Sequence, residues 1–149
     1  MDHTQWLLNN LIVVAIQLIA LTFYTLGSRK FYIEQPKFLR WIGLGIATDV
    51  LVAFIASLGW VPIVESGHIP PTGSILFWTH VICACVGMFG FIGMFIYLVI
   101  RGTQHIHRLR CLRFFQYKVL LRVWYFGVGI AIIDFMVKAL FGVRMYDYI

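Results

Sequence analysis

The sequence predicts an all-α integral membrane protein: one four-transmembrane-helix bundle over residues 1–149, with both termini outside. Hydrophobic residues make up 61% of the 149 residues and charged residues only 12%, about half the roughly 25% of soluble domains. Four apolar runs each reach the length of about 20 residues that a helix needs to cross the hydrocarbon core. The Lys and Arg residues are concentrated between the first and second runs and between the third and fourth.

The four expected spans cover residues of about 6–27, 41–64, 74–100 and 119–143. The first and third contain no charged residue, the second contains only Asp49, and the fourth contains Arg122, Asp134 and Lys138. In lipid, only helices and closed barrels satisfy their backbone hydrogen bonds. These runs are too long for barrel strands of about ten residues, so we expect helices.

Positive charge in the short loops predicts the orientation of the chain. The N-terminus and the second loop carry no Lys or Arg, so we place the first and third loops on the cytoplasmic side of a cytoplasmic (inner) membrane. There the cations are expected to contact anionic lipid headgroups. Because topology accounts for the basic charge, we expect no nucleic-acid partner. The cations of these two loops are Arg29, Lys30, Lys37, Arg40, Arg101, Arg108, Arg110, Arg113 and Lys118.

Ionisable side chains within a span are costly and usually face the interior of the bundle. Asp49 shares a stripe of small residues with Gly45 and Ala53, so we expect it to face a neighbouring helix and to form a structural ion pair with Arg122. A proton-relay role for Asp49 is the alternative. Asp134 and Lys138 are four residues apart in the order that favours a local ion pair.

The histidines separate into an outer and a cytoplasmic group. His80 and His107 are 27 residues apart, or about 40 Å along a helix, so they cannot share a ligand. On the outer side, His3, His68 and His80 are candidate ligands for copper or zinc. Asp134 lies at the depth of His80 and is a candidate to orient its imidazole. A haem b and ordinary hydrogen-bonded histidines are the alternatives.

Three segments of the second half of the chain, ILFWTHVICA, HIHRLRCLRFF and VWYFGVG, carry a family resemblance. They resemble the small four-helix membrane family of CtaM/YozB-type haem–copper oxidase assembly proteins. The matching features are the Thr79-His80 pair, the His107-Arg108 collar, and an aromatic pair followed by Gly127. The resemblance covers roughly the last 70 residues and implies a role beside a respiratory membrane complex.

We therefore expect a small accessory or assembly subunit of a prokaryotic membrane redox complex of respiratory type, with no catalytic activity of its own. It would pack against larger membrane subunits, and His80, beside Asp134, is the best candidate for contact with a cofactor. One alternative is a metal- or haem-binding electron-transfer subunit that uses His80. The other is a purely structural packing subunit.

The charge distribution generates a topological prediction. Alkaline phosphatase fused after Ile149 should be active, because the enzyme folds only outside the cytoplasm, whereas the same reporter inserted after Gln35 in the first loop should be inactive. A cytoplasmic fluorescent reporter should give the opposite pattern. Activity of the Ile149 fusion only with the cytoplasmic reporter would contradict the predicted orientation.

Overall fold

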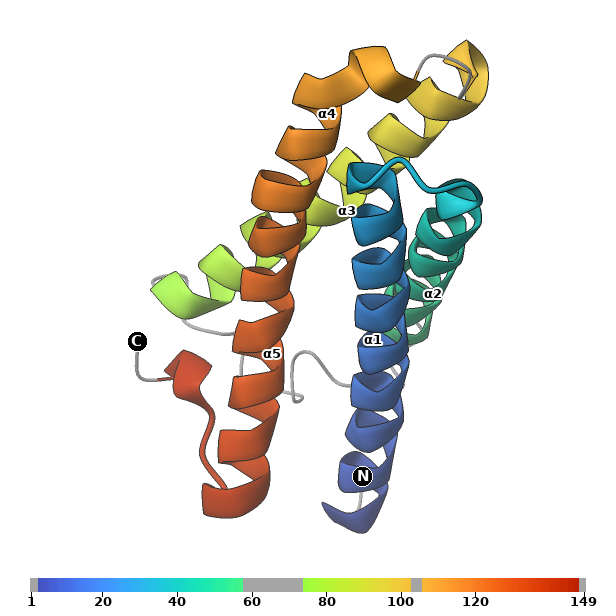
Figure 1. Ribbon diagram of the computed structural model, residues 1–149. Coiled ribbons are helices and arrows are strands. Elements are labelled where there is room, and N and C mark those ends of the chain that lie inside the picture. The colour runs from blue at the N-terminus through green and yellow to red at the C-terminus, as the bar shows by residue number, and fades with distance from the viewer. Residues whose placement is uncertain (1–2, 58–73, 103–105, 148–149) are drawn as a thin grey trace.

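A computed structural model describes residues 3–57, 74–102 and 106–147, and these residues form helices and no strand. The order of elements is shown in Figure 1. The bounds are α1 His3–Tyr32, α2 Phe38–Ser57, α3 Ile75–Arg101, the 3-10 turn η1 Ile106–Leu109, α4 Arg110–Phe115, the π-helical segment η2 Gln116–Leu120, α5 Leu121–Phe141 and the 3-10 turn η3 Met145–Asp147.

Four helical stretches are long and apolar enough to cross a membrane: Thr4–Tyr32, Phe38–Ile55, Ile75–Arg101 and His107–Phe141. The all-helical class is thereby confirmed, and the four helices support a multi-pass membrane protein. The first helix continues five residues beyond the predicted end at residue 27, and residues 58–64 of the second predicted span lie outside the described residues.

The segment expected to form the third loop is largely helical, which corrects the predicted start of the fourth span. After Gly102, whose φ of 75° ends α3, the chain is helical again from Ile106 and continues through α4 and η2 into α5. Arg and Leu are good helix formers, so basic residues do not interrupt a helix that leaves the bilayer. The positive charge therefore did not mark the end of the helix.

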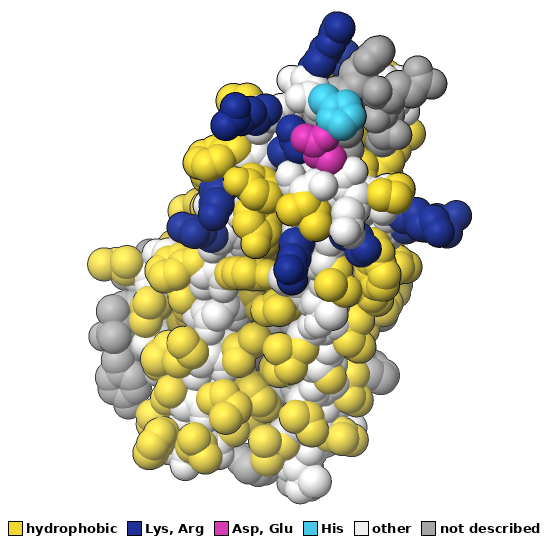
Figure 2. Space-filling view, in the orientation of Figure 1, with side chains coloured by type: hydrophobic (Ala, Val, Ile, Leu, Met, Phe, Trp, Pro, Cys, Tyr) yellow, Lys and Arg dark blue, Asp and Glu magenta, His cyan; other side chains and the backbone are white. Residues whose placement is uncertain are grey.

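All nine cations of the first and third loops lie at one end of the bundle, which we call the basic end (residues 29–40 and 101–118). Figure 1 shows the C-terminal ends of α1 and α3, the start of α2, and α4 together at this end. Figure 2 shows Lys and Arg side chains over the upper part of this face and mainly hydrophobic side chains below. The charge is therefore segregated along the axis of the bundle, as a membrane-spanning helix bundle requires.

The helices pack as two close pairs, α1 with α2 and α3 with α5. Glycine allows the second pair to approach closely. A Cβ atom on Gly87 of α3 would lie 2.6 Å from the Cβ of Trp124, and one on Gly127 of α5 would lie 2.8 Å from the backbone nitrogen of Ala84. Small residues at such contacts are typical of helices packed in lipid.

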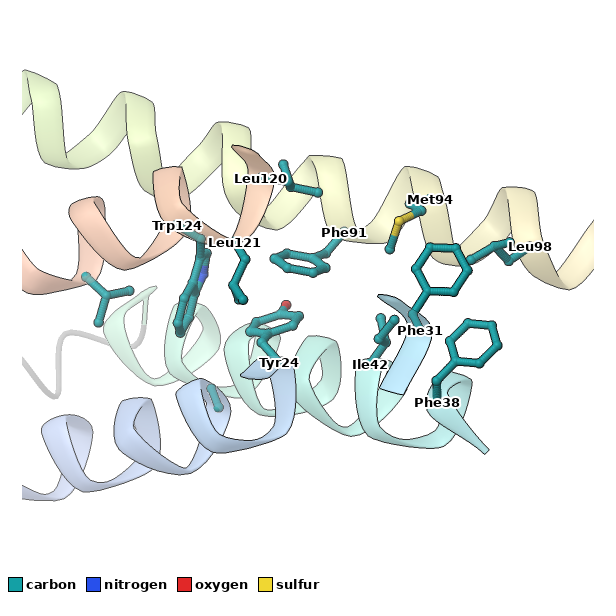
Figure 3. Close-up of a cluster of buried hydrophobic side chains, with 12 residues drawn as sticks. Tyr24, Phe31, Phe38, Ile42, Phe91, Met94, Leu98, Leu120, Leu121 and Trp124 are labelled. Atoms are coloured by element: carbon teal, nitrogen blue, oxygen red, sulfur yellow. The ribbon is translucent and has the colours of Figure 1, made fainter. Parts of the chain in front are cut away.

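The two pairs are joined by a cluster of buried aromatic side chains, drawn in Figure 3. The ring of Tyr24 stacks on Phe91 with centroids 4.1 Å apart and meets Trp124 edge-on at 4.9 Å. All three side chains are fully or almost fully buried. The cluster thus connects α1, α3 and α5 near the middle of the bundle.

Asp49 of α2 completes this cluster and is 9% exposed. Its Oδ2 accepts hydrogen bonds from Trp124 Nε1 at 3.0 Å and from Tyr24 Oη at 3.3 Å. These two neutral donors stand where the sequence suggested an ion pair with Arg122, whose side chain is exposed. The carboxylate therefore links three helices by hydrogen bonds.

Substitution of Asp49 by Ala should destabilise the protein by about 1–3 kcal/mol, because an interhelical hydrogen bond in a membrane contributes roughly 0.6–2 kcal/mol and Asp49 accepts two. Asp49→Asn retains an acceptor oxygen and should lose less. The measurement is the unfolding midpoint in a mild detergent. Arg122→Gln is the matched control and should leave the midpoint nearly unchanged; a loss as large as that of Asp49→Ala would restore the ion pair as the stabilising interaction.

Candidate functional site

A cavity of about 340 Å³ lies between α1, α3 and α5, toward the end of the bundle opposite the basic end. The two helix pairs diverge there in Figure 1. Aromatic and aliphatic side chains form most of its wall, and several polar side chains enter from all three helices and from the segment after α5. These polar side chains are Asn10, Gln17, His80, Asp134, Lys138 and Arg144. We call it the interhelical cavity.

His80 lies six residues into α3, about 8 Å from the start of the helix at 1.5 Å per residue. Its Nδ1 lies 2.8 Å from the carbonyl oxygen of Gly127. Because a carbonyl only accepts hydrogen bonds, Nδ1 must carry the proton. In the neutral ring, Nε2 then holds the lone pair that accepts a hydrogen bond or binds a metal.

Asp134 lies in the same cavity as His80, but the Gly127 carbonyl is the group that orients the imidazole. The buried Asp134 carboxylate accepts hydrogen bonds from the backbone nitrogens of Met145 at 2.8 Å and Tyr146 at 3.3 Å. Gly142, with φ 75°, turns the chain back after α5 so that this contact can form. Asp134 therefore fixes η3 over the cavity.

Tyr146 is the side chain that this arrangement places beside His80. The two rings are nearly parallel, with centroids 6.4 Å apart, and Phe77 meets the Tyr146 ring edge-on. Burial, followed by the nearby Asp134 charge, raises the pKa of the Tyr146 phenol, which stays protonated as a donor. Its buried Oη has no hydrogen-bond partner within the part of the chain that the structure describes.

Lys138 approaches the opposite wall of the interhelical cavity. Its Nζ lies 4.5 Å from the centroid of the Trp6 ring, and the Trp6 ring contacts Phe135 at 5.8 Å. Both Lys138 and Asp134 line the cavity, and their predicted ion pair stays a prediction. The cavity thus contains the Lys138 ammonium, which lies over the Trp6 ring, together with His80 and Tyr146.

His3, His68 and His80 were predicted to form a metal site, and the structure describes only the side chain of His80. His68 lies outside the described residues, as does the side chain of His3. Within 3–57, 74–102 and 106–147, no three His, Cys, Asp or Glu side chains cluster to hold a metal ion. His80 alone would supply one nitrogen ligand, so the three-histidine site stays a prediction.

Sequence reasoning singled out His80 and Asp134 but missed two groups beside them and one acidic residue at the basic end. The Gly127 carbonyl is a backbone group and gives no residue-type signal. Tyr146 follows the last span, where only the turn at Gly142 hinted that the chain folds back. Glu34, at the basic end, forms ion pairs with Arg113 and His107. The sequence feature that could have identified it is that it is the one acidic residue among the nine Lys and Arg of residues 29–40 and 101–118.

Comparisons with protein-family models, with curated proteins and with solved structures find no match to this chain. The geometry of the interhelical cavity therefore carries the functional argument.

The anchoring role of Asp134 generates a prediction. Asp134→Ala removes the acceptor of two backbone amides, so η3 should detach and the amides of Met145 and Tyr146 should exchange hydrogen at least tenfold faster in mild detergent. Asn10→Ala is a matched control in the same cavity, because Asn10 bonds to the Trp6 carbonyl of its own helix. Equal exchange in wild type and Asp134→Ala would show that η3 is held by other contacts.

Proposed function

We propose that this protein is a small accessory or assembly subunit of a prokaryotic membrane redox complex of respiratory type, and that the interhelical cavity is its working site. In this proposal it acts by binding, beside larger membrane subunits, and catalyses no reaction itself. The resemblance of the His80 and His107 segments to haem–copper oxidase assembly proteins supports the respiratory context. The segregated charge supports a cytoplasmic membrane with both termini outside.

The interhelical cavity carries the proposal. Polar side chains at membrane depth are costly unless they serve a ligand or a partner, and this cavity gathers them from three helices and the segment after α5. It offers an acceptor at His80 Nε2 and a donor at Tyr146 Oη, inside walls that are mostly apolar. Apolar walls with a few convergent polar groups are typical of binding sites, and a subunit that only fills space does not need them.

A second candidate function is electron transfer through a metal or haem bound at His80. The observation that favours it is the tautomer of His80: the Gly127 carbonyl fixes the proton on Nδ1 and leaves Nε2 as the ligating nitrogen, which is the arrangement of metal-bound histidines. Candidates for a second ligand are His3, His68, Asp134 of the same cavity and a partner subunit.

The test is affinity purification of the tagged chain from native membranes in mild detergent, with the recovered subunits, the haem spectrum and the copper content measured together. Wild type should retain larger membrane subunits that carry redox cofactors. His80→Ala removes the acceptor from the cavity and should lower their recovery several-fold.

The matched control is the double variant His105→Ala/His107→Ala, which removes the two histidines of residues 101–118. It should retain the complex, because the exposed His107 side chain is far from the cavity. A stable monomer without partners in wild type would contradict the accessory role and favour a structural protein. Haem or copper on the isolated chain that disappears in His80→Ala would favour the electron-transfer function.

A further inference from the structure

A second cavity lies at the basic end, between the last residue of α1 and α4. It has a volume of about 350 Å³ and is lined by Tyr32, Arg110, Arg113 and Phe114. This size falls within the roughly 300–1,000 Å³ that small-molecule sites occupy. Two guanidinium groups and two aromatic rings on so few residues give it both a charged and an apolar wall. We call it the basic-end cavity.

Arg113 is held rigidly in this cavity. The side chain is only 8% exposed, its Nη1 donates to the Tyr32 carbonyl at 3.1 Å, and it forms an ion pair with Glu34. Its Nε is also buried and has no hydrogen-bond partner among residues 3–57, 74–102 and 106–147. A buried donor without an acceptor is costly, so this guanidinium has a hydrogen bond left to donate to one more negatively charged oxygen.

The charge around the basic-end cavity favours an anion. Glu34 already pairs with Arg113 and also contacts His107. No second acidic residue occurs in residues 29–40 or 101–118, against nine Lys and Arg. Arg110 lines the cavity and is exposed, so its charge is available. Two arginines on one cavity suit a phosphate, which the planar guanidinium binds through paired hydrogen bonds.

Exposed apolar side chains follow the basic-end cavity along the chain toward α5. Phe114 is 54% exposed, and Phe115 and Val119, further along toward α5, are 50% and 41% exposed. Tyr32 stacks on Tyr117 with centroids 4.9 Å apart and the Lys118 ammonium lies over both rings. A ligand that ends in a phosphate and continues into hydrocarbon would contact both kinds of wall.

We propose that the basic-end cavity binds the phosphodiester headgroup of an anionic phospholipid. Arg110 and the guanidinium of Arg113 hold the phosphate, and the acyl chains lie against the exposed apolar side chains next to Phe114. A basic pocket at the membrane surface is a known way for proteins to select anionic lipids. This lipid site goes beyond the proposed function and does not depend on the interhelical cavity.

The experiment is calorimetric titration of the full-length protein in neutral detergent with short-chain phosphatidylglycerol, short-chain phosphatidylcholine and inorganic phosphate in separate arms. Phosphatidylglycerol should bind saturably, and the other two at least tenfold more weakly. Arg110→Gln should weaken phosphatidylglycerol binding about fivefold, the change that corresponds to roughly 1 kcal/mol for one cation at an anionic surface.

Arg40→Gln is the matched control, since Arg40 is an exposed arginine of the same basic end that does not line the cavity. It should change the affinity less than twofold. Equal losses in the two variants would mean a diffuse electrostatic attraction and overturn the site. Phosphatidylcholine carries the same phosphodiester beside a choline cation, so binding as tight as that of phosphatidylglycerol would overturn the selectivity for an anionic headgroup. Equally tight binding of inorganic phosphate would mean that the ligand is a free anion and not a lipid.

Arg110 is preferred to Arg113 for the test because loss of Arg113 would also remove its ion pair with Glu34 and its hydrogen bond to the Tyr32 carbonyl, and so disturb the fold. Phe114→Ala provides the apolar counterpart. The Phe114→Ala variant should bind phosphatidylglycerol more weakly than wild type and inorganic phosphate with unchanged affinity. An equal loss of affinity for both ligands would overturn the role of the apolar wall.

Discussion

The hydrogen bonds of one carboxylate and the aromatic contacts around it hold the four long helices in register. Asp49 on α2 accepts from Tyr24 on α1 and from Trp124 on α5, and Phe91 on α3 stacks on Tyr24. In a bilayer, burial of apolar surface does not favour helix–helix contact over lipid contact, so packing and interhelical hydrogen bonds determine which helices meet. A cluster that joins all four helices therefore specifies the arrangement more strongly than the many lipid-facing side chains do.

Glycine makes room for the two large rings of this cluster. A Cβ on Gly45 would lie 2.8 Å from the Tyr24 ring, and a Cβ on Gly87 would lie 2.6 Å from the Cβ of Trp124. The helices are thereby close at the Asp49 cluster. Away from it, toward the end opposite the basic end, α1 is separated from α3 and α5 by the interhelical cavity. Close packing in the middle and separation at one end are two consequences of where the small residues lie.

The number and class of the spans could be predicted because long apolar runs have few alternatives in lipid. The partners of the buried polar groups could not. Asp49 was matched with Arg122 by depth and charge, but depth does not give the direction of a side chain around the helix, and two neutral aromatic donors supply the hydrogen bonds instead. His80 and Asp134 were expected at similar depth, and both line the interhelical cavity. Their direct partners include backbone groups of Gly127, Met145 and Tyr146, which residue type does not reveal.

The polar chemistry of this protein divides between its two ends. At the basic end, cations exceed acidic groups nine to one in residues 29–40 and 101–118, and Glu34 holds Arg113 in position. At the other end, His80, Asp134 and Lys138 lie within the span and face one cavity. Charges near the headgroups remain solvated at little cost, whereas polar groups within the hydrocarbon must be satisfied by the protein or by what it binds. The proposed lipid site therefore lies at the basic end, and the proposed recognition of a cofactor or partner lies at the interhelical cavity.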